Sequence, residues 1–173
     1  MNNNRNIKSN ILIKALFGIY CILVIWIILF KFSLSLNEIM NLDRIRDINL
    51  IPFYYANDVG FISHFEEVFQ NFLIFIPLGI YLKMLNKENN KIIFTGFLFS
   101  LILELSQFVF GIGATDITDL ITNTLGCVMG VWMYCLLEKE FINKDKINNV
   151  LKSLSLVATV LFCLIIMVLL ISN

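Results

Sequence analysis

Charged residues are scarce in this sequence: Asp, Glu, Lys and Arg make up 15% of its 173 residues. Soluble domains carry about 25% charged and about 45–50% apolar residues, whereas 58% of this chain is hydrophobic and its mean hydropathy is +0.82. Thirteen basic residues balance thirteen acidic ones, so no excess of positive charge favours nucleic acid as a partner. The composition excludes an ordinary soluble domain and predicts a small polytopic membrane protein.

Cysteine and histidine are also few, with four cysteines and one histidine in the whole chain. The cysteines form no Cys-x-x-Cys pair and lie in apolar runs, where a cysteine behaves as a small hydrophobic residue. The pattern excludes a disulfide scaffold and a zinc site, and we expect neither a metal nor a cofactor. His64 stands alone just outside an expected span, where a histidine is usually uninvolved in chemistry.

Long apolar runs dominate what is present, and five of them are long enough to cross a bilayer as helices of about 20 residues. They lie at 11–32, 68–85, 91–112, 117–137 and 153–172. The runs exceed the length of a barrel strand and lack period-2 alternation, so the expected fold is an all-α membrane helix bundle. The first run is too long for a signal peptide. Pro77 in the second predicts a kink whose freed carbonyl needs a partner from a neighbouring helix.

The basic residues predict how the spans are oriented. Ten of them fall on the side of the N-terminus and three on the other, at Lys31, Arg44 and Arg46. The positive-inside rule then predicts a cytoplasmic N-terminus and an extracytoplasmic C-terminus. The same orientation puts the loop 33–66 and the turn 111–116 outside.

Polar residues at helical spacing gather near the outer ends of three spans, where ionisable groups are costly and suggest a functional or partnered site. They are Ser100, Glu104 and Gln107 on the third span, Asp116, Asp119 and Asn123 on the fourth, and Glu67 and Asn71 on the second. The turn between the third and fourth spans is short, so these two must be antiparallel neighbours. We expect Glu104, Gln107, Asp116, Asp119, Asn123 and Asn71 to converge in one pocket, with Glu67 beside it.

Structural roles compete with functional ones for several of these residues. Asp116 is a candidate helix N-cap, because a carboxylate there accepts backbone N–H bonds. Glu104 lies more than two turns inside an apolar run, where capping cannot explain it. Gly126 and Gly130 form a Gly-x-x-x-Gly step that lets another helix approach closely, and that step makes an oligomer possible.

The predicted outer loop adds a second candidate feature. Arg46 precedes Asn49-Leu50-Ile51-Pro52-Phe53, which two tyrosines follow. An apolar turn with nearby arginines and tyrosines fits re-entry at the headgroup level, where arginine can pair with phosphate. An ordinary amphipathic interface loop is slightly favoured as the explanation of Arg46, Asn49, Pro52 and Phe53.

Four motifs, in order from about residue 46 to 137, resemble the VanZ-like family of bacterial membrane proteins. They are Asn49 to Phe53, Asn71 to Gly79, the Glu104-x-x-Gln107 pair and the acidic stretch Asp116 to Gly126. Many members carry an arginine shortly before a paired Asp-Asp. Here Gly113 stands near that arginine's place and Thr118 replaces one acid.

The resemblance implies one VanZ-like membrane domain over 1–173 and a role at the outer face of the membrane, in resistance to teicoplanin-type glycopeptides or in envelope homeostasis. The first hypothesis is a factor that binds an amphiphile, either the drug's lipid tail or a polyprenyl-linked wall precursor. The second is an enzyme that acts on a lipid-linked substrate through Glu104, Asp116 and Asp119. The third is an assembly partner of envelope proteins whose buried acids only join helices.

Overall fold

The computed structural model describes residues 2–30, 48–54, 61–85, 88–112, 115–140, 146–157 and 159. Helices dominate this part of the chain, with two very short strands between them. In chain order the elements are α1 (Asn2–Phe30), β1 (Ile48–Asn49), α3 (Phe61–Met84), α4 (Asn89–Phe110), β2 (Thr115–Asp116) and α5 (Ile117–Glu140). A further helical segment covers residues 146–157. The all-α bundle that the sequence predicts is confirmed.

Four helices are long and apolar enough to span a membrane, and they match the first four predicted spans. Within the described residues these stretches are Ile11–Leu29, His64–Met84, Asn89–Phe110 and Ile117–Glu140. Helix α3 begins at Phe61, ahead of the predicted start at 68, because its first turns are too polar to count as an apolar run. The fifth predicted span, 153–172, is helical where the structure describes it, and the rest lies outside the described residues.

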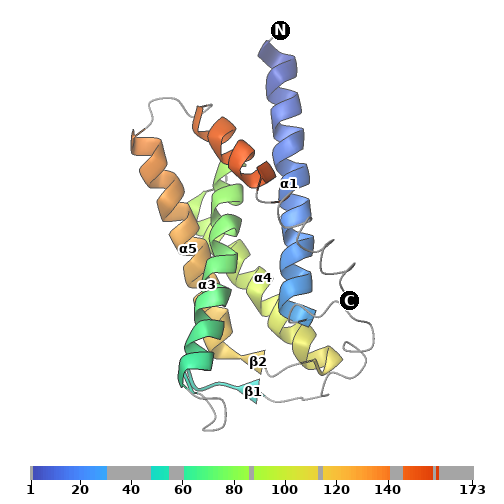
Figure 1. The fold of residues 1–173 in the computed structure, drawn as a ribbon, viewed down its shortest axis with the longest axis vertical. Coiled ribbons are helices and arrows are strands. Elements are labelled where there is room, and N and C mark those ends of the chain that lie inside the picture. Colours follow the sequence, from blue (N-terminus) through green and yellow to red (C-terminus); the bar gives the residue numbers. More distant parts are fainter. Residues whose placement is uncertain are drawn as a thin grey trace.

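The bundle has one end that carries both strands, which we call the sheet end (Figure 1). Helices α1 and α4 finish at the sheet end, whereas α3 and α5 start there (Figure 1). Helix α5 therefore runs antiparallel to α4, as its short connecting turn predicts, and parallel to α3. The most extensive helix packing joins α5 to α3.

Two glycines on α5 allow this close packing. A Cβ atom added to Gly126 would lie 2.2 Å from the carbonyl oxygen of Phe72, and one added to Gly130 would lie 2.0 Å from that of Ile76. The close neighbour is therefore α3, and not α4, which the turn alone would favour. The Gly126 and Gly130 surface, through which the sequence makes an oligomer possible, is occupied by α3 of the same chain, and association between copies stays a prediction.

Cys127 sits at the centre of the bundle between two further glycines. A Cβ atom on Gly79 of α3 would lie 2.1 Å from the Cys127 carbonyl oxygen, and one on Gly96 of α4 would lie 2.7 Å from its Sγ. The thiol is fully buried and belongs to the apolar core with Phe75 and Leu103. Cys127 therefore has a packing role, as the sequence indicates.

Helix α3 continues through Pro77, whose missing N–H leaves the carbonyl of Leu73 without its helical donor, and α1 makes a hydrogen bond to the next residue along. The Tyr20 hydroxyl of α1 donates a 2.7 Å hydrogen bond to the carbonyl oxygen of Ile74, in the turn that precedes the proline. This bond satisfies a carbonyl within the bundle, where lipid could not.

Candidate functional site

Glu104 is buried at the sheet end, with 2% of its surface exposed. Its Oε2 accepts a 3.1 Å hydrogen bond from the backbone N–H of Asp116, across the turn between α4 and α5. The Thr115 hydroxyl donates a 3.1 Å bond to the backbone carbonyl of Glu104. A carboxylate in an apolar span is therefore turned into the protein and not toward lipid.

The sequence of the turn explains this return of the chain onto Glu104. Gly111 ends α4 with φ 66°, a left-handed conformation that favours glycine. The N–H groups of Gly111 and Ile112 bond back to the carbonyl groups of Phe108 and Gln107, at 3.2 and 3.1 Å. This cap reverses the chain at once, so that β2 follows within a few residues of α4.

Asp116 performs two structural tasks with its two side-chain oxygens. Its Oδ1 accepts a 2.7 Å bond from the N–H of Thr118, which confirms the predicted N-cap of α5. Its Oδ2 accepts a 3.1 Å bond from the amide Nδ2 of Asn49. Asp116 thus joins the start of α5 to the segment that carries the first family-like motif.

The segment that contains Asn49 forms β1, which pairs in parallel with β2, in the connection between α4 and α5. Ile48 of β1 lies opposite Thr115 of β2, and Asn49 lies opposite Asp116. Asn49 also accepts the N–H of Ile51 at 3.1 Å, which tightens the following turn. The predicted loop motif is therefore fixed directly over the start of α5; Arg46 of the same motif lies outside the described residues.

Thr118 binds the residues that follow Asn49, at Phe53. The backbone N–H of Phe53 donates a 3.0 Å bond to the Thr118 hydroxyl, and Thr118 is fully buried. Phe53 has φ 57°, an uncommon value for a residue other than glycine. In the sequence, Thr118 stands out only as the replacement of an acid; its role as an acceptor, which needs an oxygen but no charge, is not predicted.

The backbone of residues 50–54 is fixed by these bonds, yet the side chains of these residues stay exposed. Exposed fractions reach 71% for Leu50, 61% for Ile51, 54% for Phe53 and 57% for Tyr54, and Pro52 is also exposed. We call these five residues the apolar turn. Large exposed apolar side chains held in one place are typical of a surface that meets lipid or an apolar ligand.

Below the turn, buried amides extend the polar site into the bundle. The Asn123 amide nitrogen donates a 2.9 Å bond to the Ser100 hydroxyl, and the Gln107 amide nitrogen donates a 3.0 Å bond to the carbonyl oxygen of Ile28 on α1. Both amides are almost fully buried. Gln107 thus ties α4 to α1, while Asn123 ties α5 to α4.

The remaining predicted residues lie around Glu104 at different depths. Asp119 is half-buried in the first turn of α5 and Glu67 is exposed on α3. Both carboxylates, with Asp116, are close enough to act on Glu104 electrostatically. Asn71 is half-buried one turn beyond Glu67, and the hydrogen bonds described above do not include it. The structure therefore brings the predicted acids together, with Asn71 at the margin.

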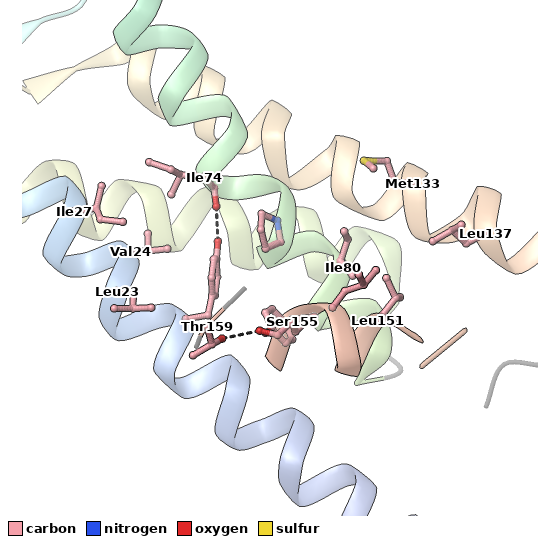
Figure 2. A pocket seen from close by; sticks show the side chains of 14 residues that line it. Leu23, Val24, Ile27, Ile74, Ile80, Met133, Leu137, Leu151, Ser155 and Thr159 are labelled. Carbon is pink, nitrogen blue, oxygen red and sulfur yellow. Dashed lines mark hydrogen bonds between the residues drawn. The ribbon is translucent and has the colours of Figure 1, made fainter. Parts of the chain in front are cut away.

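An apolar cavity of about 540 Å³ lies between α1, α3, α5 and the helical segment that follows α5. In Figure 2, Leu23, Val24 and Ile27 of α1 face Ile74 and Ile80 of α3. Helix α5 and the 146–159 segment complete the wall, through Met133, Leu137, Leu151, Ser155 and Thr159. Ile27 lines the cavity, and the adjacent Ile28 carries the carbonyl that binds Gln107, so cavity and polar site share one turn of α1.

The chemistry of the site is that of oxygen acceptors. Its side chains are carboxylates, amides and hydroxyls, and all described Lys side chains belong to the half of the bundle away from the strands. Among the described residues no three carboxylate, imidazole or thiol groups form a metal cluster by themselves. The arrangement can bind hydrogen-bond donors and positive charge.

Comparisons with known proteins agree with the architecture. The profile of the VanZ/LLP1 family matches residues 17–138, which run from the middle of α1 to near the end of α5. The curated Protein VanZ from Enterococcus faecium is 37% identical over 145 residues, which cover 83% of this chain and 85% of that protein. No solved structure matches the chain at a significant level.

Proposed function

Because this chain belongs to the VanZ/LLP1 family, we propose that it is a resistance factor of the teicoplanin type that acts at the outer face of the bacterial membrane by binding an amphiphile. The observation that carries this proposal is the position of a buried carboxylate, Glu104, directly behind the exposed apolar turn. An amphiphile likewise has a polar head and an apolar tail. The hydrogen bond between Asn49 and Asp116 joins the apolar turn to the acidic residues, so a ligand that binds the apolar turn also affects the acids beneath it.

The tail has two apolar surfaces available. The apolar turn offers exposed side chains at the membrane surface, and the cavity offers about 540 Å³ lined mainly by aliphatic side chains. Cavities of about 300–1,000 Å³ hold ligands of the size of a drug. Either the lipid tail of a glycopeptide or the chain of a polyprenyl-linked wall precursor fits this chemistry.

We place the sheet end outside, with the N-terminus in the cytoplasm. The basic residues support this orientation, because the described Lys side chains lie in the opposite half of the bundle. In a variant without native cysteines, a cysteine at Asn57 should react with an impermeant maleimide on intact cells, and one at Asn143 should react only after lysis. Labelling of the Asn143 position on intact cells would reverse the orientation.

Resistance itself is tested in a deletion strain. Loss of the gene should lower the inhibitory concentration of a lipid-tailed glycopeptide several-fold, and the wild-type gene should restore it. A glycopeptide without a lipid tail should change less, because it lacks the part that the apolar surfaces bind. Equal inhibitory concentrations in the presence and absence of the gene, for both drugs and at normal protein abundance, would reject the proposal.

An enzyme that acts on a lipid-linked envelope substrate is the second candidate, favoured by the nearby carboxylates of Glu104 and Asp119. Acid–base catalysis needs groups free to exchange protons with a substrate. Both oxygens of Asp116 already accept hydrogen bonds, from Thr118 and Asn49, and are thereby used to hold the fold. This use favours binding over catalysis.

A further inference from the structure

The last four residues of the apolar turn have no unpaired backbone N–H group. The N–H groups of Ile51, Phe53 and Tyr54 bond to Asn49 Oδ1, the Thr118 hydroxyl and the Ile51 carbonyl, at 3.1, 3.0 and 3.2 Å. The fourth residue is a proline, which has no N–H. Water would satisfy such groups at an exposed turn, whereas an unpaired N–H is costly in lipid. The bonding of this turn is therefore that of a segment in contact with lipid.

The turn is attached at the depth where a membrane span begins. Thr118, which accepts the Phe53 N–H, lies in the first turn of α5, one of the helices long and apolar enough to cross a membrane. The 24 residues of α5 measure about 36 Å along the axis, slightly more than the hydrocarbon thickness of about 30 Å. The start of α5, and the apolar turn with it, therefore falls at the boundary between acyl chains and head groups.

Exposed apolar side chains also end the neighbouring spans at the sheet end. Val109 and Phe110 close α4 with 63% and 65% of their surface exposed. On the first turns of α3, Phe65 and Phe69 are exposed and stack with their ring centroids 6.2 Å apart. Residues 50–54 carry no charged side chain. A bilayer that covers the ends of α3 and α4 therefore meets in the apolar turn a further surface of the same chemistry.

We infer that the apolar turn is a membrane anchor, whose side chains insert into the outer leaflet at the boundary between acyl chains and head groups. Interfacial segments bury their apolar face about 5–10 Å deep in this region, and tyrosines are enriched there. The bonds to Asn49 and Thr118 fix the backbone before insertion, so little conformational entropy is lost. The inference rests on the proposed function only for the choice of leaflet, and its test uses neither a drug nor an orientation.

The emission of a single tryptophan measures the depth of the turn. Full-length protein with both native tryptophans, Trp26 and Trp132, replaced by phenylalanine carries Phe53→Trp and is reconstituted into phosphatidylcholine vesicles. The lipid chains are brominated either near the head group or near their ends. We expect bromine near the head group to lower the emission at least about twofold, and more than bromine at the chain ends, because interfacial side chains lie about 5–10 Å deep. Iodide in the aqueous phase should quench weakly.

Matched reporters on α5 supply the two reference environments. Trp132, retained as the single tryptophan, is 56% exposed within the span and should be quenched by brominated lipid but not by iodide. Glu140→Trp lies exposed at the end of α5 away from the strands and should be quenched by iodide. If Phe53→Trp does not fold, Tyr54→Trp replaces it, with the same expectation.

Thr118→Val tests why the turn can insert. Valine keeps the shape of threonine but offers no acceptor, so the Phe53 N–H would be left unpaired in lipid. Quenching of Phe53→Trp by iodide should then rise at least about twofold, because water satisfies the freed N–H. Thr124→Val removes a hydroxyl that bonds to the Leu120 carbonyl within the same helix, and should leave the quenching unchanged.

Three outcomes would overturn the inference. Iodide quenching of Phe53→Trp as strong as that of Glu140→Trp would place the turn in water. Weak quenching by both iodide and brominated lipid would show that a second copy of the chain covers the turn. Unchanged quenching in Thr118→Val would show that insertion does not depend on the paired N–H.

Discussion

Glu104→Gln should abolish the resistance that the wild-type gene restores to a deletion strain, while its abundance in the membrane stays close to that of the wild type. Glutamine keeps the shape of the side chain and an oxygen that accepts the N–H of Asp116, so the contact between α4 and the turn survives. Only the charge is lost. Drug susceptibility and quantitative immunoblotting of membranes measure the two effects separately.

Two further substitutions decide between a charged site and a structural one. Glu104→Leu removes the acceptor and leaves the Asp116 N–H buried without a partner, which costs about 1–3 kcal/mol and should lower abundance. Asp119→Asn should reduce resistance if the charge at the cluster is what acts. Full resistance in both Glu104→Gln and Asp119→Asn would reject the charged site and favour an assembly partner.

The largest loss of stability is expected for Gly130→Ala. A Cβ atom there would lie 2.0 Å from the carbonyl oxygen of Ile76, a backbone atom that cannot rotate away. Helices α3 and α5 would have to separate along their whole contact, at a cost of about 3 kcal/mol. The midpoint of thermal unfolding in detergent should fall by roughly 10 °C.

Gly18→Ala is the matched control for this substitution. Nothing lies within 4 Å of a Cβ atom at Gly18, which is also in a helix. The same change there should raise stability by about 0.5–1 kcal/mol, because alanine favours the helix. A Gly130→Ala midpoint equal to that of Gly18→Ala would show that α3 and α5 are not packed as described.

Helices, capping and the burial of Glu104 could be predicted because each depends on local sequence. Apolar runs give the spans, the i, i+4, i+7 pattern puts Glu104 on one face with Gln107, and Asp116 before an apolar run predicts an N-cap. The proximity of Glu104 to Asp116 and Asp119 follows from one additional fact, the short turn that connects α4 to α5. Its functional role remains a prediction, because geometry alone does not show what binds.

The contacts between distant segments could not be predicted in the same way. Gly126 permits close approach by any helix, and nothing local selects α3 over α4 as its neighbour. The pairing of Asn49 with Asp116 joins residues 67 positions apart, and strands of two residues leave no periodic pattern. Thr118 was overlooked because a hydroxyl that accepts one backbone bond resembles any other threonine in a helix.

The bond between Asn49 and Asp116 also bears on the order in which the protein is made. At about 5–20 residues per second of synthesis, the 67 positions between them correspond to a delay of roughly 3–13 s. Throughout that interval the partners of the apolar turn, Asp116 and Thr118, have not yet left the ribosome. The bonds that fix the apolar turn therefore cannot form until the start of α5 has been synthesised.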